Sequence, residues 1–406
     1  MRDRKQVFMF FAVSFLFYMA ANFAHPVTPT IIKHRGFGDY IFGVALASMM
    51  TANFLVSPFW GKAITVFSSR KTLLICSIGY AIGQLMFGLA KAETMILAAR
   101  VFAGAFTGGL FTACLTYVVN TSPEDVRGSY LTASATLHLV GGSFGYFIGG
   151  MLGEIHENVA VGVQVVTLMV VGVLFYLVCE DDSIQDMPNV GRGSFFREAN
   201  PLAAFIAARH IMTPLFIAIF AVSALSNLGG IAFDQSLNYY MKAQLGFSSG
   251  YNGVIKAITG FVALLVNSTI GIRLINNSDA RKSSIWVYSL CSIAMAAIVL
   301  LNSIVPLGIV VVVYFGLYAV SVPLTQSIVA DKSSGYDSNL VMGCYNGLRS
   351  LGGIFGALAS GLLYTVNPKG PFVLAFVAFS LTTAASVHYY SASVREDFEV
   401  QNGADD

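Results

Sequence analysis

Long apolar stretches recur along the whole chain and limit what it can fold into. About twelve such stretches of roughly 20 residues lie between Met1 and Asp406, and roughly 20 residues is the length that a helix needs to cross a bilayer. The composition agrees, because 56% of the residues are hydrophobic, 11% are charged and the mean hydropathy is +0.70. A soluble domain this apolar would aggregate, so the sequence predicts an integral membrane protein.

The backbone decides which kind of membrane structure is expected. A helix satisfies every backbone N–H and C=O group without water, whereas a membrane barrel needs shorter segments of alternating polarity. The unbroken stretches therefore predict an all-α integral membrane fold with about twelve transmembrane helices. The first stretch, over 6–32, is longer than a signal-peptide core and has no convincing cleavage site, so we expect it to remain as the first transmembrane helix.

The basic residues predict how the chain lies in the membrane, because Lys and Arg in short loops favour the cytoplasmic side. With the N-terminus inside, most of the 23 basic residues fall in cytoplasmic loops. The predicted outer loops hold Lys33, Arg35, Lys91, Lys242 and Lys369. We expect a multi-pass protein of the cell membrane with both termini in the cytoplasm. The net charge of +2 is explained by this distribution and gives no support for a nucleic-acid partner.

Motifs for metal binding and covalent chemistry are weak. The cysteines lie singly in or at the ends of predicted helices, without the paired spacing of a zinc or redox motif: Cys76, Cys114, Cys179, Cys291 and Cys344. Residues 141–145 fit the Gly-x-Ser-x-Gly pattern of serine hydrolases, but a spanning helix supplies neither the strand-to-helix elbow nor the triad partners. The sequence therefore predicts a protein that is not an enzyme and that uses no metal or cofactor.

The longest polar segment between the apolar stretches divides them into two equal sets. It runs over about 180–209, starts with an acidic run at 180–182 and contains Pro188, Gly191 and Gly193. We expect an N-terminal six-helix bundle over 1–180, a cytoplasmic linker over 181–209, a C-terminal six-helix bundle over 210–394 and a cytoplasmic tail over 395–406.

The two sets of helices carry related sequences. Residues 138–145 align without a gap on 349–356, which begin 211 residues later, and Gly150 and Gly361 then also match. The pair Arg70-Lys71 recurs as Arg281-Lys282 at the same offset. Several separate matches at nearly one offset indicate that one six-helix unit occurs twice, in parallel. Parallel repeats related by an axis along the membrane normal are typical of one large class of secondary transporters.

At these residues the chain resembles the major facilitator superfamily, and within it the twelve-helix drug:proton antiporters. Residues 26–29 (PVTP) are similar to the Pro-Val-x-Pro signature of that branch, and 97–104 (LAARVFAG) contain its Leu-x-x-Arg pattern at Arg100, with Ala103 in the place of a Gln. Residues 141–150 are similar to its fifth-helix antiporter motif, with Tyr146 in the place of the proline. The resemblance implies two pseudo-symmetric bundles that rock around a central site.

The loop between the second and third helices is the weakest match. The superfamily carries Gly-x-x-x-Asp-Arg-x-Gly-Arg-Lys there. This chain retains Gly61, Arg70 and Lys71, with spacing one residue longer and Thr65 at the acidic position. The resemblance implies a gating role for these three residues, but a gate built on the aspartate is not expected here.

Ionisable side chains within apolar stretches are candidates for function, because a charge near the bilayer centre costs roughly 2.5–3.5 kcal/mol on insertion scales. His138 and Arg349 lie near the membrane midplane at equivalent positions of the repeat. We predict that both bind substrate, with the guanidinium holding a carboxylate, a phosphate or an acidic partner. The alternative is that each bonds a carbonyl at a helix contact and never meets substrate.

Asp234 is the carboxylate well inside an apolar stretch, and His25 lies near the equivalent position of the first repeat. A carboxyl or imidazole that takes up and releases a proton as access alternates is what proton coupling needs. The resemblance implies that Arg100 tunes such a proton site. The alternatives are an ion pair of Asp234 with a cation such as Lys256, exposure of Asp234 at the outer vestibule, and a structural role for Arg100.

Two further sets complete the candidate site. Polar residues on helices that line the cavity in this family are predicted to contact substrate: Asn22, Gln235, Asn238, Tyr239 and Asn346. Small residues with four-residue spacing, together with Gly104 of the fourth-helix motif, are predicted to pack helices closely at a moving interface: Gly141, Gly145, Gly149, Gly352 and Gly356.

The sequence therefore predicts a secondary active transporter that exports an amphipathic small molecule in exchange for protons by alternating access. The main alternative is proton-coupled uptake or exchange of a small organic anion, which the core cations Arg100, Lys256 and Arg349 favour. A lipid-translocating or receptor protein with the same fold is a further alternative. The expected partners are a small-molecule substrate, protons and the lipid bilayer, with a monomeric protein and no nucleic acid.

Overall fold

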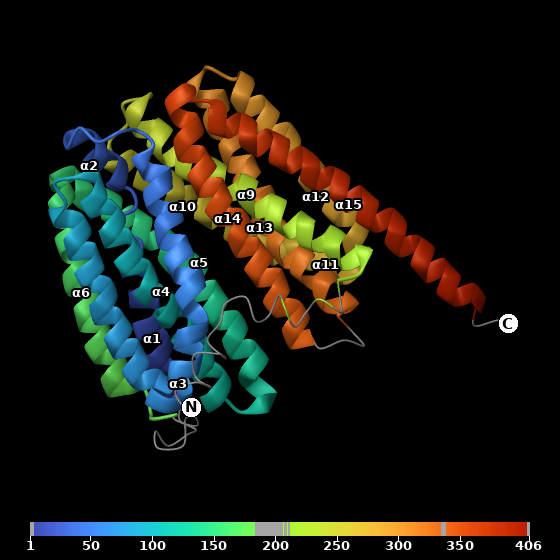
Figure 1. Cartoon of the computed structure of the whole chain (residues 1–406), viewed down its shortest axis with the longest axis horizontal. Coiled ribbons are helices and arrows are strands. Elements are labelled where there is room, and N and C mark those ends of the chain that lie inside the picture. The colour runs from blue at the N-terminus through green and yellow to red at the C-terminus, as the bar shows by residue number, and fades with distance from the viewer. Residues whose placement is uncertain (1–3, 183–205, 207–208, 210–211, 334–337, 404–406) are drawn as a thin grey trace. The chain divides into compact units, whose positions relative to one another are not determined.

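A computed structural model describes residues 4–182, 206, 209, 212–333 and 338–403. Within these residues every regular element is a helix, which confirms the predicted all-α fold (Figure 1). The elements of the first half are α1 Arg4–Ala20, α2 Thr28–His34, α3 Ile41–Leu89, α4 Glu93–Thr121, α5 Glu124–Ile155 and α6 Glu157–Val178. Those of the second half are α9 Pro214–Ala243, α10 Ser249–Val266, the π-helical segment η3 Asn267–Gly271, α11 Ile272–Asn277, α12 Ala280–Leu300, α13 Ile304–Lys332, α14 Ser338–Val366 and α15 Gly370–Gly403.

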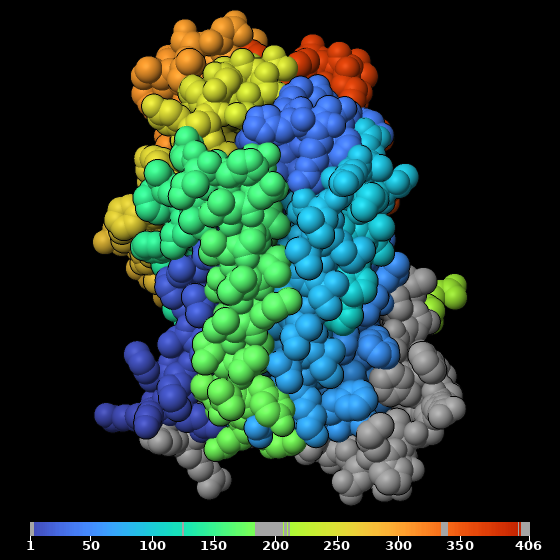
Figure 2. Space-filling view, turned by 90° about the vertical axis from the view of Figure 1, so that its left-hand side faces the viewer, coloured from blue at the N-terminus to red at the C-terminus, as the bar shows by residue number. Residues whose placement is uncertain are grey.

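The lengths and compositions of these helices suit a membrane. Among the described residues, eight helical spans are long and apolar enough to cross a bilayer. Seven of them lie in a single helix, and one runs from α10 to α11. Many apolar side chains on their surfaces are exposed, for example Val166, Val173 and Leu177 on α6. Figure 2 shows α6 (green) beside α3 (light blue) on one face of the molecule, and these two helices pack against each other. Exposed apolar surface of this extent is expected where lipid is the solvent.

The predicted first helix over 6–32 is interrupted. α1 ends at Ala20, and residues 21–27 form turns before α2 begins at Thr28. Pro26 lies in the interruption and Pro29 lies in the first turn of α2. Proline has no N–H to donate and clashes with the preceding turn, so it is tolerated at the start of a helix but not in its interior. The prediction of one continuous helix was therefore wrong at this point.

α3 contains two predicted transmembrane stretches in one helical run of 49 residues. The run changes direction at Ser68, whose backbone has φ 72° and ψ 157°. Non-glycine residues rarely adopt this conformation, which costs on the order of 1–3 kcal/mol. The Asp182 carboxylate, which follows α6, accepts hydrogen bonds from the Ser69 backbone N–H (2.6 Å) and hydroxyl (2.7 Å) and so stabilises the start of the second part of α3.

The chain divides into two compact units. Unit 1 comprises Met1–Ala203 and Asn238–Gly260, and unit 2 comprises Ala204–Leu237 and Phe261–Asp406. The C-terminal end of α9 and most of α10 thus pack with the first six helices. The domain boundaries predicted from the sequence stay a prediction, and most of the predicted linker over 181–209 lies outside the described residues. The predicted tail over 395–406 is helical as far as Gly403.

The internal repeat is visible in the backbone of the two halves of the sequence. Gly36 and Gly246, at equivalent positions of the repeat, both have left-handed φ values, 67° and 70°. A glycine-rich face of α5 lies against the backbone of α1: a methyl group at Gly145 would overlap the Met19 carbonyl. In unit 2, the equivalent face of α14 lies against α9, and a methyl group at Gly356 would overlap the Leu228 carbonyl. Glycine permits these close backbone approaches because it has no side chain.

Candidate transport site

His138 lies in an aromatic cluster of unit 1. Its ring centroid is 4.8 Å from that of Tyr18 on α1 and 5.3 Å from that of Phe111 on α4. The Tyr18 hydroxyl lies 3.3 Å from the Ser134 hydroxyl, which fixes the tyrosine in place. Tyr18 is buried, whereas His138 and Phe111 are exposed. The His138 ring is tilted by 40° to the Tyr18 ring and by 54° to the Phe111 ring, so the cluster presents a mainly apolar aromatic surface with one ionisable ring.

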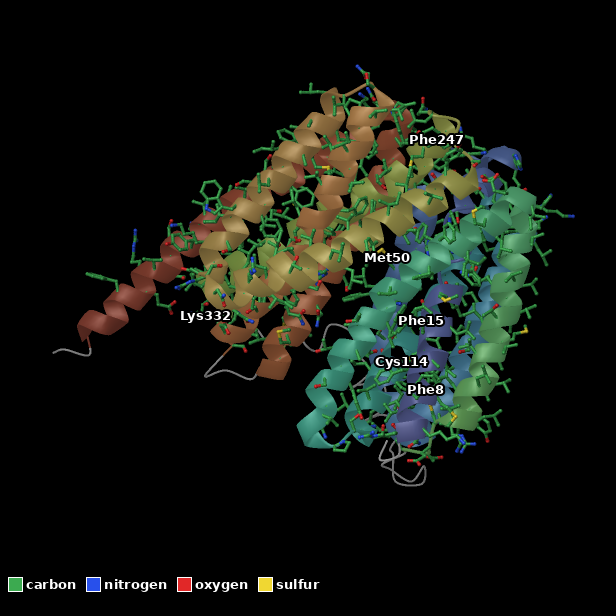
Figure 3. The ribbon with its side chains drawn as sticks, turned by 180° about the vertical axis from the view of Figure 1, so that it is seen from behind. Phe8, Phe15, Met50, Cys114, Phe247 and Lys332 are labelled. Carbon is green, nitrogen blue, oxygen red and sulfur yellow. The ribbon has the colours of Figure 1, made fainter. Side chains whose placement is uncertain are left out.

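Asn22 lies next to this cluster. Its side-chain amide donates a 2.9 Å hydrogen bond to the Tyr18 carbonyl, and it faces Gly142 on α5, where a Cβ would be 3.5 Å from the amide nitrogen. Two residues predicted from the sequence, Asn22 and His138, are thus brought together around Tyr18. Phe8, Phe15 and Cys114 are labelled on the same set of helices in Figure 3, and the Phe15 ring lies 6.3 Å from that of Phe144 on α5.

Arg349 lies in the equivalent position of unit 2. The Asn227 side chain on α9 donates a 2.8 Å hydrogen bond to the Arg349 carbonyl, and the Tyr318 hydroxyl on α13 donates to Asn227 at 3.4 Å. Arg349 is half-buried, and Asn346, one turn earlier on α14, is exposed. The surface around Arg349 is therefore polar, whereas the surface around His138 is aromatic.

The sequence reasoning missed Asn227 and Tyr318. The sequence did contain a signal for Asn227. Asn227 lies 209 residues after Tyr18, and Arg349 lies 211 residues after His138, so the two pairs occupy nearly equivalent positions of the repeat. The contact between α1 and α5 in the first repeat therefore recurs between α9 and α14. No comparable sequence signal marked Tyr318.

Asp234 and Gln235 lie in the C-terminal half of α9 and are both half-buried. The Gln235 amide donates a 3.4 Å hydrogen bond to the Asp234 carboxylate. The neighbouring Phe233 is fully buried against Tyr314 and Phe372, with ring centroids 4.7 and 5.5 Å away. The packing of Phe233 therefore fixes the direction in which this part of α9 presents its polar residues.

His25 belongs to a second cluster of unit 1, built around Tyr146. The two rings stack with centroids 5.5 Å apart and planes 15° apart. The Lys256 ammonium lies 5.4 Å from the centre of the Tyr146 ring. Tyr146 occupies the place of the proline in the antiporter motif, and it was not among the predicted site residues. The Tyr146 ring thus accommodates the Lys256 ammonium in a cation–π contact.

Arg100 lies in the core beside this cluster and is 5% exposed. Its guanidinium covers the Phe87 ring at 3.9 Å and donates weak hydrogen bonds to the Thr28 hydroxyl (3.4 Å) and the Met49 sulfur (3.9 Å). Thr28 belongs to the Pro-Val-x-Pro signature. The signatures of the first and fourth helices therefore meet at this arginine. Gly104, one turn further along α4, lies against the Met49 backbone.

Asn238 and Tyr239 lie in a hydrogen-bond network that joins α9 and α10 to the first helices within unit 1. Asn238 is buried; its amide donates to the His25 carbonyl at 3.1 Å and its side-chain oxygen accepts from Asn252 at 2.9 Å. The Tyr239 hydroxyl donates to Asp39 at 2.5 Å, and the Lys33 ammonium lies 2.7 Å from the same carboxylate oxygen. These two predicted substrate residues are engaged in contacts between segments far apart in sequence.

Asp39, which the sequence analysis did not single out, lies in the loop between α2 and α3. Burial by itself raises the pKa of the Asp39 carboxyl, but the hydrogen bonds from Lys33 and Tyr239 and the charge of Lys33 outweigh it and hold the pKa below its usual range. Asp39 is therefore ionised at neutral pH.

Comparison with known proteins decides the family. The family model described as "Major Facilitator Superfamily" matches residues 10–357. The chain belongs to the Major Facilitator Superfamily. The resemblance inferred from the helix signatures is thus confirmed, and the superfamily consists of membrane transporters, so the chain is a multi-pass membrane protein built as a secondary active transporter.

Individual relatives of this superfamily member are distant in sequence but match over nearly the whole chain. Multidrug resistance protein 1 of Bacillus subtilis (strain 168) is 19% identical over 92% of this chain and 93% of its own length. Quinolone resistance protein NorA of Staphylococcus aureus (strain N315) is 19% identical over 91% of this chain and 93% of its own length.

Solved structures of the superfamily show the same fold. The human organic anion transporter MFSD10 (TETRAN) matches with a TM-score of 0.67 at 19% identity, covering 95% of this chain and 100% of that chain. A mutant of the nucleoside transporter NupG matches with a TM-score of 0.71 at 14% identity, covering 95% of this chain and 98% of that chain. Both are similar in fold at identities that carry no information on substrate.

The segment over 61–71 of this superfamily member, which was predicted as a loop, lies within the helical run of α3 on both sides of the bend at Ser68. Arg70 donates a 2.6 Å hydrogen bond to the Tyr176 carbonyl on α6 and lies over the Tyr176 ring, and Lys71 lies 3.8 Å from Asp181. Gly61 has room around it, since the nearest atom to an added Cβ would be 4.0 Å away on Thr112. Two carboxylates that follow α6, Asp181 and Asp182, thus contact the bent segment of α3 that has Thr65 at the acidic position of the motif.

The candidate site is built from aromatic rings, amides and isolated ionisable groups, which suits an organic ligand. Among the residues that the structure describes, no three or more His, Cys, Asp or Glu side chains are grouped so that they could hold a metal ion, and all five cysteines are buried.

Proposed function

We propose that the chain exports an amphipathic small molecule across the cell membrane in exchange for protons, as a monomer with both termini in the cytoplasm. The family and the names of the relatives, which are multidrug and quinolone resistance proteins, support this proposal. The observation that carries it is the exposed His138 ring in contact with Tyr18 and Phe111, because a mainly aromatic surface binds the apolar part of an organic molecule.

The substrate contacts are proposed separately for each unit. In unit 1 the apolar part of the substrate stacks on Phe111 and His138, and Asn22 offers an amide to its polar part. In unit 2 Arg349 and Asn346 on α14 and Tyr318 on α13 provide polar contacts. Gln235 is proposed to contact substrate beside Asp234. Asn238 and Tyr239 are proposed to act chiefly through the network at the predicted outer ends of the helices.

Proton coupling is assigned to Asp234 and His25, with Arg100 as the residue that tunes the site. Asp234 is half-buried and hydrogen-bonded to Gln235, so its protonation changes the contacts of a substrate-facing segment of α9. His25 stacks on Tyr146, and its backbone carbonyl accepts from Asn238. A change of charge at His25 therefore affects the hydrogen bond between Asn238 and the His25 carbonyl.

Alternating access requires the outer network to break and form again. Within unit 1 it consists of the Tyr239–Asp39 and Asn238–His25 hydrogen bonds, the 3.1 Å contact between the Thr30 and Ser249 hydroxyls, and the 2.5 Å hydrogen bond from the Gly250 N–H to Glu154. We propose that these polar contacts form the outer gate, because several modest hydrogen bonds are easier to exchange with water than a packed apolar core.

Exchange or uptake of a small organic anion is the second candidate. The Arg349 guanidinium in unit 2 and the cations around Tyr146 in unit 1 favour it, since a carboxylate or phosphate pairs well with such groups.

Transport in proteoliposomes under an imposed pH gradient tests the proposal. The parent protein should drive uphill movement of a planar dye, and His138→Leu should reduce it at least fivefold, about 1 kcal/mol at RT ≈ 0.59 kcal/mol. His388→Leu is the matched control, since His388 is an exposed histidine of α15. Anion uptake that is lost in Arg349→Gln, with no dye movement, would establish the second candidate instead. Movement of lipid probes without solute flux would contradict both.

A further inference from the structure

The break between α1 and α2 changes the pairing of the backbone. In an α-helix the His25 N–H would donate to the Ala21 carbonyl, four residues earlier. Here it donates to the Asn22 carbonyl instead, at 3.2 Å, and the Asn22 N–H donates to the Met19 carbonyl at 3.0 Å. Bonds between residues three apart are typical of a 3₁₀-helix. Pro26 has no N–H to give to the Asn22 carbonyl, which leaves that carbonyl for His25.

The Ala21 carbonyl loses its helical partner in this way. Among the described residues, no backbone N–H donates to it. Two side chains of other helices do so instead: the Gln164 amide on α6 at 3.2 Å and the Tyr80 hydroxyl on α3 at 3.1 Å. The Gln164 amide also donates at 2.8 Å to the Ala20 carbonyl, which accepts from the Phe23 N–H as well. Because α6 packs against both α1 and α3, these donors meet at the end of α1.

Both donors are buried in the interior of unit 1. Gln164 and Tyr80 are 0% and 2% exposed, and they belong to helices that are apolar enough to span a membrane. The Gln164 side-chain oxygen has no hydrogen-bond partner among the described residues, so only the N–H groups of this amide are paired. Buried amides and carbonyls without partners are costly. The two side chains therefore stabilise the 3₁₀ arrangement of residues 21–25 over an α-helical one.

Residues 21–25 carry two members of the proposed transport site. The Asn22 amide donates a 2.9 Å hydrogen bond to the Tyr18 carbonyl, and the His25 ring stacks on Tyr146. Successive residues are turned by about 100° in an α-helix and by about 120° in a 3₁₀-helix. An α-helical arrangement of this segment would therefore turn Asn22 and His25 out of their present contacts.

We propose that Gln164 is a positioning residue of the transport site, with Tyr80 as its partner. By occupying the Ala21 carbonyl, the two side chains keep residues 21–25 in the 3₁₀ arrangement and so determine where Asn22 and His25 point. Both act through the backbone, and their burial keeps them away from substrate. The roles of Asn22 and His25 rest on the proposed function, whereas the control of the segment by Gln164 does not.

Thiol labelling of the purified full-length protein tests this control without any transport measurement. Asn22→Cys places a reporter in the segment, and Phe15→Cys places one in the unbroken part of α1 (Figure 3). Gln164→Met keeps the length of the side chain but has no N–H donor, so the segment loses its anchor. Labelling at the Asn22 reporter should become at least about threefold faster, and labelling at the Phe15 reporter should stay unchanged. No change at the Asn22 reporter, or equal acceleration at both, would overturn the proposal.

Two buried hydroxyls of α3 provide a matched pair of variants. Tyr80→Phe removes the hydroxyl that donates to the Ala21 carbonyl. Ser77→Ala removes a hydroxyl about one turn earlier that has no hydrogen-bond partner among the described residues. Tyr80→Phe should accelerate labelling at the Asn22 reporter, but less than Gln164→Met does, because it removes one of three hydrogen bonds to the segment. Ser77→Ala should not accelerate it, and equal rates in the two variants would contradict the role of Tyr80.

A pH profile of transport separates positioning from a loss of folded protein. In proteoliposomes Gln164→Met should shift the pH of half-maximal driven flux by at least about 0.5 unit, because His25 is moved from its surroundings. A variant that only reduces the amount of folded protein lowers the flux at every pH and keeps the midpoint. Reduced flux with an unchanged midpoint would therefore overturn the positioning of His25. If the parent moves no solute while labelling changes as expected, the proposed function is wrong and the control by Gln164 is confirmed.

Discussion

The Tyr239 hydroxyl donates a 2.5 Å hydrogen bond to the Asp39 carboxylate, which lies 200 residues earlier in the chain. Lys33 binds the same oxygen, and Tyr239 stacks on Phe42 with ring centroids 4.6 Å apart. One side chain of the second repeat is thereby fixed by three residues of the first. This relationship makes Tyr239 a structural element of the proposed outer gate.

Tyr239→Phe should loosen this contact without disturbing the ring packing on Phe42. A hydrogen bond to a charged group contributes roughly 1.5–3 kcal/mol, and partial exposure of Asp39 places the expected loss at the lower end. Loosening can be measured through Ser249→Cys, a buried position whose hydroxyl contacts Thr30, as faster labelling by a membrane-impermeant thiol reagent. The native cysteines are buried and give little background. Tyr251→Phe, at an exposed tyrosine of α10, should not change the rate.

The contribution of Asp39 should depend on pH in a defined direction. Its pKa is lower in the folded protein than its ordinary value of 3.8, so the stabilisation is present above that value and is lost as the pH falls through the folded pKa. The difference in thermal stability between the parent and Tyr239→Phe should therefore be constant from about pH 5 to pH 8 and shrink below about pH 4. A difference that already disappears at pH 6 would mean that another group controls this contact.

Ser68→Gly should stabilise the protein, because Ser68 adopts a backbone conformation that glycine reaches without strain. The Ser68 hydroxyl is buried and makes no hydrogen bond to the described residues, so little is lost with the side chain. We expect a gain of about 1 kcal/mol in the free energy of unfolding, seen as a higher midpoint temperature.

The neighbouring Ser69→Ala provides the contrast, since it removes a hydroxyl that donates to Asp182 and should lower stability by about 1 kcal/mol. If Ser68→Gly lowers stability as much as Ser69→Ala, the backbone strain at Ser68 is not real.

Gly145→Ala should be strongly destabilising, because the added methyl group would overlap the Met19 carbonyl of α1. Overpacking of this kind costs roughly 1–3 kcal/mol and forces the two helices apart. Gly356→Ala should behave in the same way against α9. Gly162→Ala on α6 is the matched control: nothing lies within 4 Å of an added Cβ, and alanine favours helix, so stability should stay equal or rise. Thermal unfolding in detergent compares the three, and equal effects would rule out close packing as the cause.

Asp234→Asn should abolish uphill transport driven by a pH gradient while leaving substrate exchange at equilibrium intact, because the amide keeps the shape of the side chain and cannot carry a proton. Asp234→Glu retains a carboxyl and should retain part of the driven flux. The two variants are compared in proteoliposomes with and without the gradient. Full driven flux in Asp234→Asn would move the coupling assignment to His25.

The membrane class, the helical fold and the repeat followed from the sequence. In lipid the backbone N–H and C=O groups of a spanning segment must be hydrogen-bonded without water. Apolar stretches of membrane length therefore predict helices. The repeat was visible because the glycines of 138–145 and 349–356 must stay small where helices approach closely. Backbone hydrogen bonding within a helix depends on neighbouring residues, and the small residues recur at a constant offset in the chain. Both patterns can be recognised in a sequence.

Which residues meet depended on the tertiary structure. Pro26 lies in a break of the first helix that apolar periodicity did not reveal, and Asp182 bonds Ser69 at the bend of α3 from a position 113 residues later in the chain. Asp39 and Tyr146 were not recognised, because a loop carboxylate and a helix aromatic look ordinary until Tyr239 and His25 pack on them. Contacts between distant segments depend on how complete helices pack, and no local pattern of residues specifies that packing.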